Sequence, residues 1–108
     1  MQINPERIPK TEANVYTLTL ATGASSAEPM SCTYTIEGNL CIVNLAAVTK
    51  ATSGDIAINL PPAKTRSNIT ILDGGGGVVI IYIDPNMGIM YMTSPVTNLY
   101  TEFVYIMA

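Results

Sequence analysis

The chain has 108 residues, of which 48% are apolar, 12% are charged and none is histidine or tryptophan, and its formal net charge is −3. These totals predict a single domain of common size with a substantial core, although charged residues usually make up about 25% of a protein. The five cations are scattered rather than clustered, which argues against nucleic-acid binding, and no apolar run reaches the roughly 20 residues of a membrane-spanning helix.

The first residues differ in composition from the rest of the chain. Residues 1–12 hold four of the thirteen charged residues and two prolines, so we predict an extended arm or linker there and one domain over 13–108. No basic stretch followed by an apolar stretch stands at the beginning, and we therefore expect no signal peptide. Synthesis in the cytoplasm is expected.

Short segments with alternating apolar and polar residues follow, as is typical of half-buried strands. In the first half of the chain we predict strands at 15–21, 31–36, 40–46 and 56–60. Loops are predicted at 23–29 and 49–55, and a turn at 37–39 joins the second strand to the third. Cys32 and Cys41 flank this turn at positions unsuited to a disulfide, so we predict free and mostly buried thiols.

The second half continues the same pattern. Strands are predicted at 68–72, 78–83, 89–93 and 100–107, and the DPNMG stretch at 84–88 is a strong turn signal. About eight short strands without a helical period predict an all-β fold, an antiparallel β-sandwich or barrel. The segments 78–83 and 100–107 are apolar on both faces, so a second face needs covering and we expect a homo-oligomer.

Four consecutive glycines at 74–77 raise the question of a phosphate-binding loop. A P-loop needs Gly-Lys-Ser/Thr at its end and opens a helix, whereas here Val78 and Val79 open a strand. The run also lacks the spacing of a dinucleotide-binding loop. We therefore predict a hairpin loop in which the absence of side chains permits close packing.

The residue inventory argues against catalysis. Without histidine, the chain lacks the commonest general base and the usual partner of a serine or cysteine nucleophile. Two cysteines nine residues apart do not form a zinc site, and the eight acidic residues are scattered. We expect no enzymatic activity, no metal and no cofactor.

Four segments together resemble a known class of domain: YTIEGNLCIVNLAAVT, IAINLPPAKT, SNITILDGGGGVVIIYIDPNMGIMYM and YTEFVYIMA. Over residues 34–106 they are similar to the C-terminal modules of tailed-phage tail-fibre, receptor-binding and baseplate-appendage proteins. The resemblance implies a homotrimer in a virion, made in the host cytoplasm, that binds a host cell-surface saccharide without catalysis. The alternative is a structural head-fibre, capsid-decoration or baseplate subunit that binds other virion proteins and no sugar.

A candidate saccharide site combines planar polar side chains with an aromatic face on loops held by strands. The best local cluster consists of Asp84 and Asn86 in the late turn, Tyr91 on the following strand, and Asn98 in the loop before the last strand. The competing interpretation is purely structural, with turn-forming Asp and Asn residues and a tyrosine that bridges core and surface.

Overall fold

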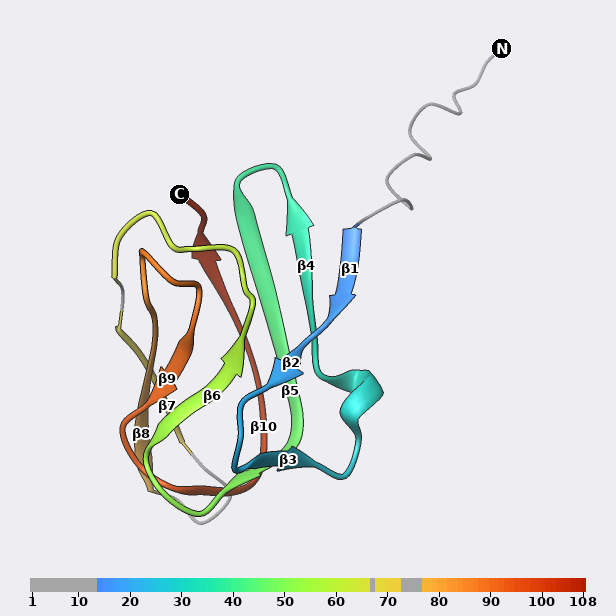
Figure 1. The fold of residues 1–108 in the computed structure, drawn as a ribbon, viewed down its shortest axis with the longest axis vertical. Helices are drawn as coiled ribbons and strands as arrows, with labels where there is room; N and C mark the ends of the chain where they lie inside the picture. Colours follow the sequence, from blue (N-terminus) through green and yellow to red (C-terminus); the bar gives the residue numbers. More distant parts are fainter. Residues whose placement is uncertain (1–13, 67, 73–76) are drawn as a thin grey trace.

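The computed structural model of the chain describes residues 14–66, 68–72 and 77–108. In this part of the chain, ten strands form two antiparallel sheets that face each other (Figure 1). The prediction of an all-β antiparallel sandwich is confirmed. The arm predicted at 1–12 and three of the four glycines of the run, at 74–76, lie outside the described residues.

The first sheet is built around the longest strands. Its order is β1 (Asn14–Thr17), β4 (Thr33–Glu37), β5 (Leu40–Lys50) and β10 (Val96–Ile106), and β3 (Ala24–Ser26) also pairs with β5. β5 and β10 each contain eleven residues, and this neighbouring pair runs along the length of the sandwich.

The second sheet has shorter strands. Its order is β2 (Thr19–Leu20), β6 (Gly54–Ile58), β9 (Met90–Met92), β8 (Val78–Ile83) and β7 (Asn68–Leu72). The hairpin predicted around the glycine run is confirmed, since Leu72 pairs with Val78 at the ends of β7 and β8. A short 3-10 turn, η2 (Pro29–Ser31), connects β3 to β4.

Alternation along the strands fills the space between the sheets with apolar side chains. Many of the fully buried side chains come from three strands: Val43, Leu45 and Val48 of β5, Val79, Ile81 and Ile83 of β8, and Met90 and Met92 of β9; Ile56 of β6 and Leu99 of β10 join them. The predicted state of the cysteines is also confirmed, because both thiols are free and buried. The late methionines Met90 and Met92 therefore serve as core residues.

Several predicted boundaries are wrong. The single strand predicted at 15–21 is divided at Leu18 into β1 and β2, which belong to opposite sheets. Leu18 is buried, and its backbone N–H donates to the Cys32 carbonyl at 2.8 Å. The chain thus crosses from one sheet to the other at a residue that fills the core, a change that alternation alone does not reveal.

The loops predicted at 23–29 and 49–55 are also shorter than expected. β3 lies inside the first, and β5 continues through Lys50 instead of ending near residue 46. Pairing with β3 and β10 extends β5, and the register between β5 and β10 shifts on both sides of Leu99. Bulges of this kind bend a strand without ending it.

Asn98 was expected in a loop and instead lies within β10. Its φ is +53°, a left-handed conformation that asparagine tolerates better than most residues. Its backbone N–H donates to Thr49 Oγ1 at 3.0 Å, outside the regular ladder. The Thr49 side chain of β5 therefore accepts the hydrogen bond that a backbone carbonyl accepts in a regular ladder, and β10 begins at Val96, earlier than predicted.

Candidate functional site

Two stacked tyrosines stand on the outer face of the second sheet. Tyr82 on β8 pairs directly with Tyr91 on β9, and their ring centroids are 4.9 Å apart with an angle of 26° between the ring planes. Their neighbours along the strands, Ile81, Ile83, Met90 and Met92, are buried. Because successive residues of a strand point to opposite faces, both tyrosines point away from the core.

Arg66 extends this stack. Its guanidinium carbon lies 3.8 Å from the centroid of the Tyr82 ring, a distance typical of a cation–π contact. Arg66 precedes β7 on one side of β8, whereas Tyr91 comes from β9 on the other side. Tyr82 is therefore enclosed between Arg66 and Tyr91. On its other side, toward Asp55 of β6, the half-buried Tyr91 ring makes no ring or cation contact with a described residue, and we call this side its free face.

Polar side chains flank the tyrosines in the same row across the sheet. Asp55 on β6 pairs with Tyr91, and Asn68 on β7 pairs with Tyr82, so each pair shares one face of the sheet. Asp55 and Asn68 are exposed. The carboxylate accepts hydrogen bonds, and the amide both donates and accepts them. We call Asp55, Tyr91, Tyr82, Asn68 and Arg66 the tyrosine row.

Of the predicted site residues, only Tyr91 belongs to the tyrosine row. Asp84 and Asn86 lie in the turn that joins β8 to β9, where the Asp84 carboxylate accepts the backbone N–H of Asn86 at 2.7 Å and of Met87 at 2.9 Å. These hydrogen bonds hold the turn, so the carboxylate has a structural task there.

Asn98 lies far from this turn. It belongs to the other sheet, at the beginning of β10, where the neighbouring residue Leu99 pairs with Val48. Figure 1 shows the turn between β8 and β9 near the upper end of the sandwich and the beginning of β10 near the lower end. The structure therefore does not bring the four predicted residues together.

The other members of the row were not singled out from the sequence. The sequence pattern predicts a loop at Asp55 and a strand beginning at Asn68, and it counts Arg66 among the scattered cations. The signal that unites them is cross-strand register, which places residues distant in the chain at one level of a sheet. Alternation identifies the outward face of each strand but leaves this register undetermined.

The ionisable groups with shifted pKa values lie away from the row. Burial raises the pKa of the Cys41 thiol, which keeps it protonated and unreactive at neutral pH. Burial also raises the pKa of Tyr105 far above its usual range, and the Tyr105 hydroxyl donates to the Pro61 carbonyl at 2.7 Å. In the described ranges, no three His, Cys, Asp or Glu side chains are placed to hold a metal ion.

Comparison with known proteins gave no assignment. No protein-family model, curated protein or solved structure matches this chain. In the part of the chain that the structure describes, no helix is long and apolar enough to cross a membrane.

Proposed function

We propose that this chain is a non-enzymatic saccharide-binding domain, the receptor-binding tip of a phage virion protein, and that the tyrosine row holds the sugar. The observation that carries the proposal is the free aromatic face of Tyr91 beside the exposed carboxylate of Asp55. This combination suits a sugar ring, which has a face of C–H groups and a rim of hydroxyls. The C–H groups pack on Tyr91, and a hydroxyl donates to Asp55.

The length of the row favours more than one sugar ring. Asp55 and Asn68 are separated by three steps between neighbouring strands, or roughly 14 Å at the usual strand spacing. Arg66 and Tyr82 support Tyr91 from behind, so its ring is held in place before the ligand arrives. A ring fixed in advance loses little freedom on binding, which favours affinity.

A glycan array with the whole chain tests this proposal. We expect binding to a restricted set of glycans and loss of that signal in Tyr91→Ala. Tyr16→Ala is the matched control, because Tyr16 is 44% exposed and stacks on Tyr34 at 5.0 Å on the other sheet. A blank array, or equal losses in the two variants, contradicts the proposal.

A second candidate is supported by a different surface. The outer side of the first sheet carries an apolar face formed by Val15, Leu40, Ile42, Val104 and Ile106. Register places Val104 opposite Ile42, and Val15 in the same row across Thr35. Val15 is 58% exposed and Val104 is 50% exposed. Contiguous exposed apolar surface is uncommon in monomers and is typical of a surface that binds another protein.

This apolar face fits the homotrimer expected from the resemblance, and equally the alternative of a structural virion subunit. The two candidates differ in what binds the tyrosine row. If the chain is only a structural subunit, it binds another virion protein tightly, the array is blank, and Tyr91→Ala leaves that binding unchanged.

A further inference from the structure

Lys50 is the only buried charged side chain among the described residues, with 9% of its surface exposed. It ends β5, where it pairs with Ala24 on one side and Val96 on the other. Lys50 comes two residues after the buried Val48 in the same strand, so its side chain points to the same side, between the sheets. Lysines are almost never so deeply buried unless the ammonium has a partner.

Two glycines leave room for this side chain. A Cβ on Gly23 would lie 3.2 Å from Lys50 Nζ, and a Cβ on Gly54 would lie 3.6 Å from Lys50 Cε. Both glycines have positive φ, at +91° and +138°. A larger residue at either position would therefore strain the backbone and also crowd the Lys50 side chain. The two glycines thus leave space around the end of the Lys50 side chain.

The Lys50 ammonium has no partner within the described residues, since no hydrogen bond or ion pair joins Nζ to any of them. An ammonium carries three donors, and none of them is taken by a described residue. A lysine held between the sheets without a protein acceptor suits a ligand that supplies the acceptor.

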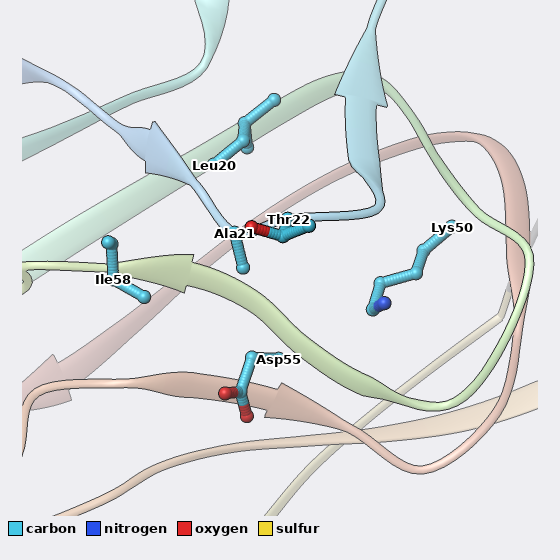
Figure 2. Close-up of a pocket in the computed structure, with 6 residues that line it drawn as sticks. All are labelled: Leu20, Ala21, Thr22, Lys50, Asp55 and Ile58. Atoms are coloured by element: carbon cyan, nitrogen blue, oxygen red, sulfur yellow. The ribbon is translucent and has the colours of Figure 1, made fainter.

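The ammonium opens into a pocket of about 450 Å³, a size suited to a small ligand (Figure 2). Leu20, Ala21, Thr22, Asp55 and Ile58 form the rest of its lining. Figure 2 shows the end of Lys50 turned toward the space between Thr22 and Asp55. The pocket therefore offers one cation, one carboxylate, one hydroxyl and apolar surface from Leu20 and Ile58.

We propose that this pocket binds the carboxylate of an acidic sugar residue, with Lys50 Nζ as the donor to that carboxylate. The inference rests on the proposed saccharide function and specifies its ligand, because Asp55 belongs both to the pocket and to the tyrosine row. The sugar carboxylate accepts from Lys50 Nζ inside the pocket, and the rest of the ligand extends past Asp55, at the edge of β6, toward Tyr91 on the outer face of the sheet.

The charges select this ligand over a phosphate. A phosphate dianion needs several cations or a row of backbone donors, whereas this pocket has a single ammonium. Asp55 also lines the pocket, with its carboxylate turned away from the Lys50 ammonium (Figure 2), and this carboxylate would repel a second negative charge but accepts hydrogen bonds from hydroxyls. A monoanion with several hydroxyl groups satisfies both residues, and uronic acids have this composition.

Titration calorimetry with glucuronate and glucose tests the inference on the whole chain. We expect glucuronate to bind more tightly than glucose, and Lys50→Met to weaken glucuronate binding by about tenfold or more, the usual effect of a lost charged hydrogen bond. Lys64→Met is the control, because it removes the same charge from an exposed position that does not line the pocket.

Lys50→Met should remain folded and melt no lower than the wild type, because it removes a buried charge without a partner. As a test that needs no variant, glucuronate should shift the NMR amide signals of Gly23 and Gly54, whereas glucose should not. Equal binding of both sugars with Lys50→Met unaffected overturns the acidic-sugar inference while the saccharide function stands. If glucuronate leaves both glycine signals unmoved, the inference is also overturned, and the glycan array then judges the saccharide function separately.

Discussion

Substitution of Gly88 by alanine tests how the fold holds the hairpin that carries Tyr82 and Tyr91. Gly88 closes the turn between β8 and β9 with φ at +66°. A Cβ there would overlap the Leu60 carbonyl oxygen, which belongs to the backbone and cannot rotate away. The Gly88 carbonyl accepts the Leu60 N–H at 3.0 Å, so a hydrogen bond joins the turn to the segment that follows β6.

The cost of Gly88→Ala has three parts. A left-handed backbone costs an alanine about 1–2 kcal/mol, partly offset by about 0.4–1 kcal/mol from the stiffer unfolded chain. Loss of the hydrogen bond between Leu60 and Gly88 costs about 1 kcal/mol. Displacement of Leu60, which is 4% exposed, adds about 1–3 kcal/mol of strain. We therefore expect the free energy of unfolding to fall by about 2–6 kcal/mol.

Gly38→Ala is the matched control for this experiment. Gly38 has nearly the same φ, at +62°, but a Cβ there meets nothing within 4 Å. Its loss should be about 1 kcal/mol or less, from backbone strain alone. In urea denaturation, Gly88→Ala should lower the midpoint by about 1 M more than Gly38→Ala does. Equal midpoints for the two variants would refute the claim that close approach to Leu60 constrains the turn.

Three further predictions concern the turn, the pH dependence and the apolar face. Asp84→Ala should lower the free energy of unfolding by about 1–2 kcal/mol without changing saccharide affinity, because its carboxylate holds two backbone N–H groups of the turn; loss of affinity in a folded variant contradicts this. Burial raises the pKa of Cys41 and Tyr105 in the folded chain, whereas the unfolded chain releases these protons near their ordinary values of 9.0 and 10.0. Stability in urea should therefore be full below about pH 9 and fall as the pH rises further, and a flat alkaline profile contradicts the assignment. If the apolar face joins copies of the chain, the wild type should run as an oligomer and Val104→Glu as a monomer in size-exclusion chromatography with light scattering, and a wild-type monomer at high concentration would exclude the trimer.

Much of the fold was predictable because its strands obey simple alternation. The hairpin of β4 and β5, the strands β7 and β8 and the turn at 84–88 all combine alternating apolar residues with glycine, proline or aspartate at the turns. The predictions failed where long-range pairing overrides the local pattern. β3 consists of Ala24, Ser25 and Ser26, residues with little strand preference, and it becomes a strand because β5 offers a partner.

The site was less predictable than the fold for a physical reason. A prediction from neighbouring residues collected Asp84, Asn86, Tyr91 and Asn98, because those positions are close along the chain. The structure instead aligns Tyr91 with Asp55, 36 positions earlier, through the pairing of β6 with β9. Lys50 was equally hidden, since its burial depends on space left by Gly23 and Gly54 in two other segments.

The central claim is that a saccharide packs on the free face of Tyr91. The most direct measurement is the affinity of Tyr91→Ala, by titration calorimetry, for a glycan that the wild type binds, with Tyr16→Ala as the control. We predict a loss of about tenfold or more in Tyr91→Ala, since exposed aromatic anchors commonly dominate binding, and no change in Tyr16→Ala. Unchanged affinity in a folded Tyr91→Ala variant would contradict the account.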